Sequence, residues 1–247
     1  MDALAYYSTR PRELYDRLLS EAERRREVVH DRSRVPPGEG TLPDALHDFL
    51  GVPRECDLCM GFDEVYGGVM ARVPGANFHD SGLGTVRGVW TLTRHLRPDV
   101  VVETGIARGF SSATILAALV ANGHGELHSI DLPEVSMLRA GQSGCAVPEE
   151  LLPRWHRLYG GSRRLLPQLL RQLGSIDLFV HDSLHTKANM AFEMRAAWQS
   201  LAHGGALLVD DADVNAAFPE FANEVGAHFL LREQGNRAGA FGVIRKP

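Results

Sequence analysis

The segment 100–112 constrains the fold most, because an apolar run passes directly into a glycine-containing turn. Residues 100–102 are three consecutive valines, a pattern typical of a buried parallel strand. Glu103 follows this run, and Gly105 and Gly109 lie in the loop before a second apolar, periodic segment. Glycine allows a sharp turn and a close approach of a ligand to the backbone. The segment therefore predicts a strand, a tight loop and a helix, which is the opening unit of an α/β fold.

A second predicted strand places an acid beside this unit. The strand covers 126–130 and is followed directly by Asp131. In nucleotide-binding α/β folds, an acid at the tip of the second strand hydrogen-bonds the ribose hydroxyl groups. The start of the predicted helix offers free N–H groups to the same ligand. These features together indicate a nucleoside-binding half-sheet.

The loop spacing differs from that of a dinucleotide site. Such a site has the pattern G-x-G-x-x-G, whereas Ala107 occupies the second glycine position here. The carboxylate of Glu103 would repel a diphosphate but suits a cationic ligand such as S-adenosylmethionine. The chain resembles a class I S-adenosylmethionine-dependent methyltransferase, with residues 103–109 as the first motif and Asp131 as the ribose-binding acid. The alternative is an ordinary turn of an α/β protein, with Asp131 as a capping residue.

Three further acids follow two later predicted strands. The apolar segment 176–181 leads into Asp182, and the strand over 206–209 leads into Asp210 and Asp211. Carboxyl ends of parallel strands line the ligand crevice, so we expect these acids to converge there. Close carboxylates acquire raised pKa values unless a cation lies among them, and oxygen ligands suit Mg²⁺. We expect a magnesium-type site; a metal-free site, in which one acid binds the substrate directly, is the alternative.

This arrangement is similar to the metal-dependent O-methyltransferases of natural-product pathways, including those acting on macrolide and aminocoumarin sugars, and to the related cephalosporin-hydroxylase-like proteins. The positions that match their motif are Asp182, His185, Asp210 and Asp211. The resemblance covers roughly residues 87–243. That family often has Asp-Gly-Asp-His-x-Tyr-Glu where this chain has His-Asp-Ser-Leu-His-Thr-Lys over 181–187, so the Tyr and Glu are missing.

The resemblance implies transfer of a methyl group to a hydroxyl of a small molecule. His185 would act as the general base, since an imidazole with an ordinary pKa of about 6.5 accepts a proton near neutral pH. A capping or positioning role is its alternative. Asp182 would also take part in catalysis, and the three acids Asp182, Asp210 and Asp211 would hold the metal. His181 precedes Asp182 within a strand and should face the opposite way, so we expect it to be structural.

The expected cofactor-binding residues lie on the loops after the first three strands and on the fourth. Ser111 and Ser112 would cap the helix or contact the methionine carboxylate, Leu132 would lie against adenine, and Ser162 would lie near it. The complete set is Glu103, Thr104, Gly105, Arg108, Gly109, Ser111, Ser112, Asp131, Leu132, Ser162 and Asp182.

Cys56 and Cys59 form a C-x-x-C pair outside this predicted site. A zinc ribbon needs a second pair, but the remaining cysteine, Cys145, is isolated. A redox pair of the thioredoxin type would lie near the start of a βαβ unit, which this pair does not. We therefore expect two reduced, partly buried thiols.

Composition excludes several classes of protein. The net charge of -5 argues against general nucleic-acid binding. No apolar run reaches the roughly 20 residues that span a bilayer. The N-terminal residues show no signal peptide, and three cysteines in 247 residues suit a reducing compartment, so we expect a cytoplasmic protein without a membrane partner.

The predicted architecture is a Rossmann-like, seven-stranded methyltransferase sheet with helices on both faces. It would occupy residues 84–247, with a helical and irregular extension over 1–83 that forms a lid or a contact in a homo-oligomer. The resemblance implies an antiparallel final strand. Besides the helix after the glycine loop, helices are expected over 11–30, 44–50, 84–95, 187–201 and 216–226. A linker is expected over 32–42 and an irregular segment over 51–70. Gly204 and Gly205 would end the helix over 187–201. Tyr66, Phe78 and His79 are candidate acceptor-pocket residues.

Two other functions stay open at this point. Asp131 would also serve the ribose of NAD(P), which would make the chain an oxidoreductase. Alternatively, the chain binds S-adenosylmethionine without turnover. The clustered acids argue against the second, because an idle site has no use for them.

Overall fold

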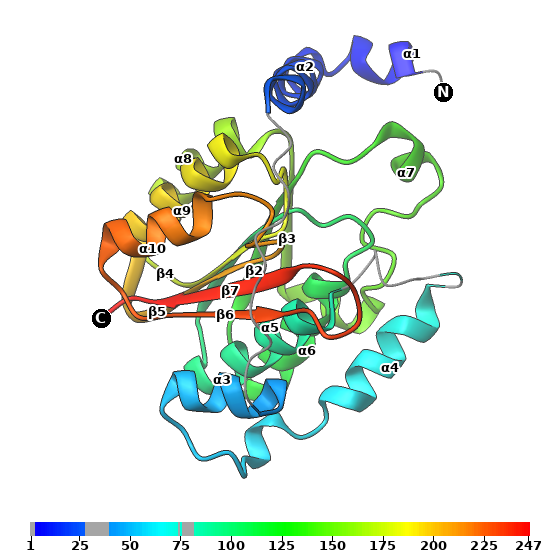
Figure 1. Ribbon diagram of the computed structural model, residues 1–247. Coiled ribbons are helices and arrows are strands. Elements are labelled where there is room, and N and C mark those ends of the chain that lie inside the picture. The colour runs from blue at the N-terminus through cyan, green and yellow to red at the C-terminus, as the bar shows by residue number, and fades with distance from the viewer. Residues whose placement is uncertain (1–2, 28–39, 74, 76–81) are drawn as a thin grey trace.

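The computed structural model describes residues 3–27, 40–73, 75 and 82–247. Its centre is a seven-stranded sheet with the strand order β3-β2-β1-β4-β5-β7-β6 (Figure 1). The first five strands are parallel to one another, whereas β7 is antiparallel to both β5 and β6. The strands are β1 Val100–Thr104, β2 Glu126–Asp131, β3 Trp155–Tyr159, β4 Ile176–His181, β5 Leu201–Val209, β6 Phe229–Glu233 and β7 Ala240–Arg245. The sheet and its antiparallel final strand confirm the predicted fold.

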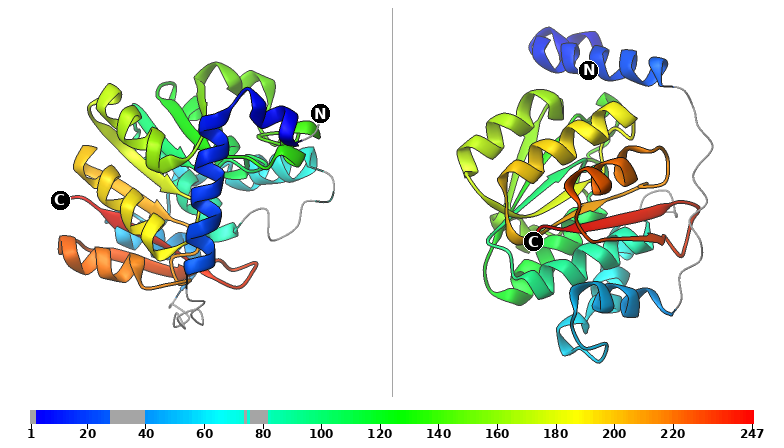
Figure 2. Two further views of the ribbon diagram at one scale, coloured as in Figure 1. Left: turned by 90° about the horizontal axis from the view of Figure 1, so that it is seen from above. Right: turned by 60° about the vertical axis from the view of Figure 1, so that its left-hand side comes forward.

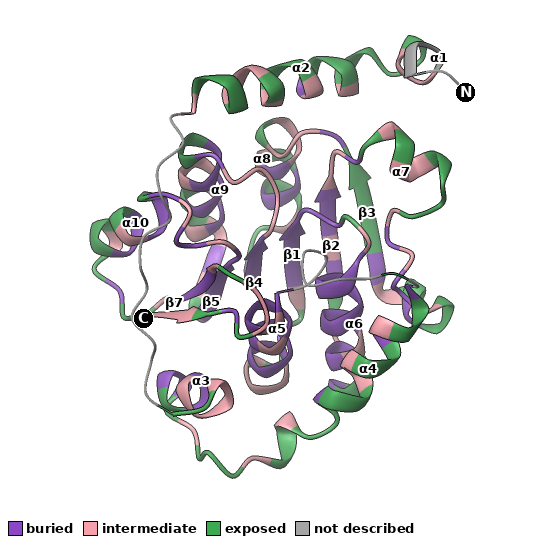
Figure 3. Ribbon diagram, turned by 45° about the vertical axis from the view of Figure 1, so that its right-hand side comes forward, coloured by how far each residue is buried: buried purple, intermediate pink, exposed green. Residues whose placement is uncertain are grey.

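Helices cover both faces of this sheet (Figures 1 and 2). One side holds α3 Leu42–Leu50, α4 Phe62–Arg72, α5 Leu83–Leu96 and α6 Phe110–Asn122, and the other holds α8 Ser162–Leu173, α9 Lys187–Ser200 and α10 Ala217–Val225. Val101 and Val102 point to opposite faces and are both fully buried, one in each hydrophobic core. The central strands β1 and β4 are buried except at one half-buried residue each (Figure 3), which explains why they are largely apolar runs rather than alternating ones.

The N-terminal helices lie apart from these two layers. Helix α1 covers Ala3–Ser8, and α2, Pro11–Arg26, crosses above the carboxyl ends of the parallel strands (Figure 2). The short helix α7, Val135–Arg139, and the 3₁₀ helix η2, Glu149–Arg154, lie between β2 and β3 in the chain. In the described part of the chain, no helix combines the length and apolar character that a bilayer crossing requires.

The segment expected to be irregular over 51–70 is partly helical. It contains the 3₁₀ helix η1, Asp57–Cys59, and most of α4. Gly67 and Gly68 lie within α4, where each costs a helix about 1 kcal/mol relative to alanine. Phe62 supplies the stabilising contact, because it is buried against Trp90 at 6.4 Å between ring centroids.

The prediction that Gly204 and Gly205 end the helix before β5 was also wrong. Helix α9 stops at Ser200, and both glycines lie inside β5. A Cβ atom on Gly205 would lie 2.7 Å from the carbonyl oxygen of Asp177, so the close approach of two backbones explains that glycine. Most of the expected linker over 32–42, together with Phe78 and His79, lies outside the described residues.

Candidate functional site

The loop after β1 runs against the end of β4. Gly105 has a φ of 90°, and its N–H donates to the carbonyl oxygen of Ile130 at 2.8 Å. A Cβ atom on Gly105 would lie 1.9 Å from the carbonyl oxygen of Asp182. Only glycine fits such a position, because both the dihedral angle and the space exclude a side chain. The loop therefore brings the first motif of the sequence directly against the start of the second.

Glu103 supports this loop from inside the protein. Its carboxylate is fully buried and accepts hydrogen bonds from Ser111, Ser112 and Ser129 at 2.6, 2.6 and 2.7 Å. Burial raises the pKa of Glu103, and the three hydroxyl groups oppose that rise. The serines thus bind Glu103 and do not cap helix α6, whose N-cap is Gly109 without a side-chain bond. This corrects the expected capping role, and Glu103 lies beneath the loop where a ligand contact was expected.

The larger cleft of the described residues, about 280 Å³, lies along the carboxyl ends of β1, β2 and β4. Five of the predicted cofactor residues line it: Gly105, Asp131, Leu132, Ser162 and Asp182. Among described residues, the linings of this cleft and of the smaller one described below do not include Glu103, Thr104, Arg108, Gly109 or Ser112. The volume suits a nucleoside-sized ligand.

Asp131 is an acid of this cleft whose carboxylate has an unsatisfied oxygen atom. Its Oδ2 atom is buried and accepts no hydrogen bond from the described residues. Burial raises the pKa of Asp131 to about 6, while the backbone N–H groups of Ile106 and Leu132 oppose the rise. A buried carboxylate oxygen without a donor is costly, and two hydroxyl groups of a ribose would satisfy it.

Helix α2 forms the roof of the larger cleft. Asp16 accepts a hydrogen bond from the N–H of Gly161 at 2.8 Å and pairs with Arg164 at 2.5 Å. Arg17 donates to the carbonyl oxygen of Leu132 at 2.7 Å and also binds Glu134. These bonds fix the helix to the loops after β2 and β3. Sequence reasoning missed Asp16 and Arg17, because nothing in a polar helix marks which of its charges face a cleft.

The predicted acids meet at the ends of β4 and β5. Nε2 of His185 lies 3.8 Å from Asp182 and 3.9 Å from Asp210, while its Nδ1 lies 3.9 Å from Asp211. Nε2 is buried without a hydrogen-bond partner among the described residues. Burial and the nearby His181 lower the pKa of His185, and burial and Asp210 raise that of Asp182 well above its usual range. The group Asp182, His185 and Asp210 can hold a metal ion, whereas Asp211 lies on the other side of the imidazole.

Arg237 provides a positive charge to this cluster. It donates to both oxygens of Asp210 at 2.9 and 3.0 Å and to Asp211 at 2.8 Å. Thr85 and Gln234 bind Asp210 as well, at 2.5 and 2.7 Å. Sequence reasoning missed all three. The turn between β6 and β7 carries Arg237 to the acids, because the start of β7 pairs with the end of β5.

A smaller cleft of about 40 Å³ opens beside these groups. Its lining includes Ser111, Asp182, Asp210, Arg237 and the apolar side chains of Val86, Ile106 and Phe110. Asp182 lines both clefts, so the two meet at this residue. Tyr66, a candidate pocket residue, instead stacks on Phe62 in helix α4.

Comparison with known proteins agrees with this geometry. Residues 102–212 match the sequence model of a family described as a methyltransferase domain. Among curated proteins, none matches the chain in sequence. A protein from Klebsiella pneumoniae, provisionally described as an O-methyltransferase, superposes with a TM-score of 0.53 at 18% identity, over 83% of this chain and 96% of that one. A Podospora anserina methyltransferase bound to S-adenosylhomocysteine superposes with a TM-score of 0.52 at 15% identity, over 87% and 99%.

At such identities the likeness to solved structures shows the fold alone, and the family match covers just under half of the chain. The matched residues begin in β1, contain the glycine loop and end just after the acids of β5. They therefore include most of the predicted site. The chain thus has the fold of these methyltransferases, and its residues 102–212 are similar to a methyltransferase domain.

Proposed function

We propose that this chain is an O-methyltransferase that transfers the methyl group of S-adenosylmethionine to a hydroxyl of a small molecule. The observation that carries the proposal is that Asp182 lines both clefts. A sulfonium in the larger cleft and a hydroxyl in the smaller one would meet at this residue. Methyl transfer is an in-line displacement, and holding the two reactants close and aligned provides much of its acceleration.

The larger cleft supplies the groups that S-adenosylmethionine needs. The orphaned oxygen of Asp131 would accept hydrogen bonds from the ribose, and Leu132 and Met137 offer apolar surface for the adenine. Ser162 lies at the start of helix α8, where it would contact the ring edge. The Podospora protein of the same fold, which is bound to S-adenosylhomocysteine, supports this placement.

His185 is the residue we assign as general base. Its lowered pKa keeps the imidazole neutral at pH 7, so it can take the hydroxyl proton as the new C–O bond forms. Asp211 faces Nδ1 at 3.9 Å and would orient the ring. This arrangement leaves Nε2, which has no hydrogen-bond partner among the residues described, to accept the proton.

A divalent cation fits the acidic side of this cluster. Asp182 and Asp210 supply hard oxygen donors, and burial together with the negative charge of Asp210 raises the pKa of Asp182, both of which a cation would offset. Asp211, the third predicted metal ligand, lies on the Nδ1 side of His185 and pairs with Arg237 at 2.8 Å. When bound there, Mg²⁺ would lower the pKa of an acceptor hydroxyl. Arg237 pairs with Asp210 and Asp211 and would keep these two carboxylates ionised beside the ion.

The N-terminal extension serves this site as a lid in our proposal. Helix α2 roofs the larger cleft through Asp16 and Arg17. Its outer face exposes Tyr15 and Leu18 at 62% and 59%, which suits an additional contact in a homo-oligomer. We place the boundary of the catalytic domain at residue 84, one residue into helix α5.

The acceptor that we propose is a hydroxylated secondary metabolite, such as a sugar or a catechol. The resemblance to natural-product methyltransferases supports this class. The smaller cleft combines apolar walls with the charged cluster, and at about 40 Å³ it would admit the hydroxyl-bearing edge of such a ring and not the whole molecule.

Calorimetric titration with S-adenosylhomocysteine, repeated with NAD⁺, tests the cofactor. We expect micromolar binding of the first and none of the second. The structure makes this comparison necessary, because Glu103 lies beneath the loop and repels no diphosphate directly. Binding of NAD⁺ alone would replace the methyltransferase proposal with an oxidoreductase.

Activity is then measured with labelled S-adenosylmethionine and a panel of hydroxylated compounds, in Mg²⁺ or in EDTA. Asp182→Asn and His185→Asn separate the two proposed roles. We expect the first variant to lose Mg²⁺ dependence together with activity. We expect the second to lose activity but still bind Mg²⁺ by calorimetry. Loss of Mg²⁺ binding in His185→Asn would make the imidazole a metal ligand and not the base, and cofactor binding without turnover of any acceptor would favour a non-catalytic protein.

A further inference from the structure

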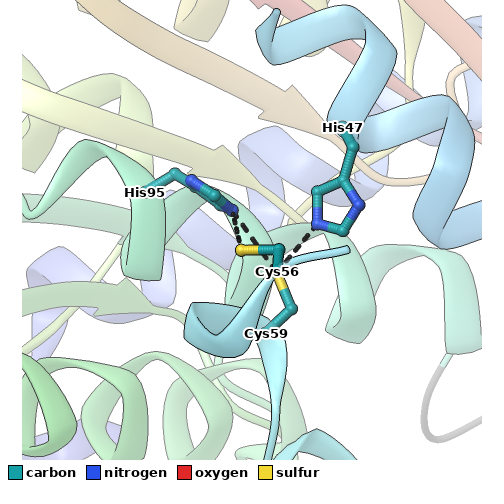
Figure 4. Close-up of side chains that lie close together, drawn as sticks. All are labelled: His47, Cys56, Cys59 and His95. Atoms are coloured by element: carbon teal, nitrogen blue, oxygen red, sulfur yellow. Dashed lines mark hydrogen bonds between the residues drawn. The ribbon is translucent and has the colours of Figure 1, made fainter. Parts of the chain in front are cut away.

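We propose that His47, Cys56, Cys59 and His95 bind one zinc ion at a structural site remote from the catalytic clefts. Figure 4 shows the four side chains converging from separate parts of the chain. His47 lies on α3, Cys56 directly precedes the 3₁₀ helix η1, Cys59 is its last residue, and His95 lies near the end of α5. The C-x-x-C pair thus has a second pair of ligands, made of two histidines that the sequence separates widely.

The distances between donor atoms fit one metal. Nε2 of His47 lies 3.1 Å from Sγ of Cys59, and Nε2 of His95 lies 3.2 Å from Sγ of Cys56 and 3.5 Å from Sγ of Cys59. All four donor atoms lie within 4.8 Å of one another. Zinc–nitrogen and zinc–sulfur bonds of tetrahedral sites imply donor–donor distances of about 3.3 to 3.8 Å. The three distances given differ from these values by a few tenths of an ångström, and a contraction of at most about 1 Å in the other pairs would complete a tetrahedron.

The types of the four donor atoms indicate which metal ion would bind. Two thiolates and two neutral imidazoles form the Cys₂His₂ set that zinc prefers in structural sites. Two thiolates also balance the charge of Zn²⁺, so the partly buried cluster would carry no net charge. Because four protein ligands fill the tetrahedron, no position is left for a substrate, which argues against a catalytic role.

The surroundings show what such an ion would stabilise. Between α3 and α4 the chain is held mainly by polar contacts: Trp90 and Arg94 of α5 donate to the carbonyl oxygens of Cys59 and Leu58 at 3.2 and 2.9 Å. Leu58 and Met60 are exposed at 37% and 71%, so this segment contributes little to the core. A zinc ion would fasten it to α5 where apolar packing does not.

The cluster is separate from the proposed active site. Helix α5 carries both Thr85, which binds Asp210, and His95. The two residues are ten positions apart, which corresponds to about 15 Å of helix, so the two groups lie at opposite ends of α5. A metal effect on stability can therefore be measured apart from a metal effect on catalysis.

The first experiment measures zinc by mass spectrometry in the full chain, purified without an affinity tag that binds metals. We expect one zinc ion per chain. Cys59→Ser should lose it, whereas Cys145→Ser, which removes the cysteine outside the cluster, should keep it. His156→Ala is a second control, because Glu126, His128 and His156 form another group that could hold a metal. Zinc lost from His156→Ala and kept in Cys59→Ser would overturn the proposal.

A second measurement guards against a variant that fails to fold. The unmodified protein is stripped of metal and titrated with Co²⁺. A tetrahedral cobalt spectrum with a sulfur-to-cobalt charge-transfer band, which Zn²⁺ then abolishes, is the expected result. We also expect a strong zinc chelator to lower the melting temperature of the wild type and to leave that of Cys59→Ser unchanged.

Two results would contradict the site directly. One is the absence of the charge-transfer band in reduced, folded protein. The other is a Cys56–Cys59 disulfide in protein purified under reducing conditions, since oxidised sulfurs cannot bind the ion. Neither result bears on cofactor binding, so the zinc site and the methyltransferase activity are tested separately.

Discussion

Nδ1 of His181 lies 2.6 Å from Oε2 of Glu193, and both side chains are completely buried. Glu193 also accepts hydrogen bonds from Thr104 at 2.5 Å and from Ser183 at 2.8 Å. The pair thus joins the ends of β1 and β4 to helix α9, directly beneath the loop that begins with Asp182. His181 has the structural position expected of it, and its partner Glu193 was not foreseen.

We predict that Glu193→Gln destabilises the protein strongly. Burial alone would raise the pKa of Glu193, but His181 and the surrounding donors lower it to about 2. The pair therefore contributes stability above pH 4.5 that is lost as the pH falls towards 2. Urea unfolding at pH 7 should show a loss of about 3 kcal/mol.

The same variant should lose less stability than the wild type between pH 4.5 and pH 2. Glu224→Gln is the matched control, since Glu224 pairs with Arg195 on the surface, where both side chains are about half exposed. Equal unfolding midpoints for both variants would show that the buried pair contributes nothing.

Cofactor affinity should depend on the ionisation of Asp131. Its pKa of about 6 in the free protein means that the carboxylate carries its charge only above that pH. Ribose hydroxyls donate to the charged form, so the affinity for S-adenosylhomocysteine should fall as the pH decreases through 6. Asp131→Asn should bind about 10-fold or more weakly at pH 7.5, as expected for a lost bond to a charged group. Calorimetry between pH 5 and 8 should also show a flat profile for this variant, and a fall as steep as in the wild type would exclude Asp131 as the source.

Gly105→Ala should disrupt the site more than a change of backbone preference explains. Gly123 is the matched control, with a φ of 84° against 90° for Gly105 and open space around its Cβ position. Both alanine variants incur the left-handed penalty of about 1–2 kcal/mol. Only Gly105→Ala also meets the carbonyl oxygen of Asp182. We expect loss of cofactor binding in that variant alone, measured by calorimetry beside the melting temperature of each protein.

Arg17→Gln should accelerate release of the cofactor. The change removes bonds from the roof helix to the carbonyl oxygens of Leu132 and Pro133. We expect an increase of about fivefold in the dissociation rate, equivalent to about 1 kcal/mol. Arg25→Gln is the control, because Arg25 is 78% exposed and, among the residues that the structure describes, pairs along its own helix with Glu21. Stopped-flow release of a fluorescent cofactor analogue measures both, and identical rates would show that the helix is no lid.

Strands and acids were predictable because each leaves a local signal. Valine runs marked β1, and acids after β2, β4 and β5 followed from the rule that parallel strands share a ligand edge. The burial of Glu103 could not be predicted, because a carboxylate at the tip of a strand can face either the ligand cleft or the protein interior. Here it faces the interior, where three serine hydroxyl groups donate hydrogen bonds to it. The sequence does not indicate in which direction those hydroxyl groups point.

Arg237 and Gln234 could not be found in the same way. They reach Asp210 only because β7 inserts between β5 and β6, which turns the hairpin back to the acidic edge. His47 and His95 were missed for a related reason. A search for a second C-x-x-C pair looks along the chain, whereas packing of α3 on α5 brings single histidines together in space.

The two clefts differ in the sequence separation of the contacts that form them. Apart from the roof helix α2, the larger cleft is lined by residues between Gly105 and Asn189, at most 84 positions apart, whereas Asp210 needs Thr85, which lies 125 positions before it. Contacts of long sequence separation form slowly in folding. A refolding chain should therefore regain its nucleoside site before its acidic cluster, and should bind cofactor in a form that is not yet able to turn over.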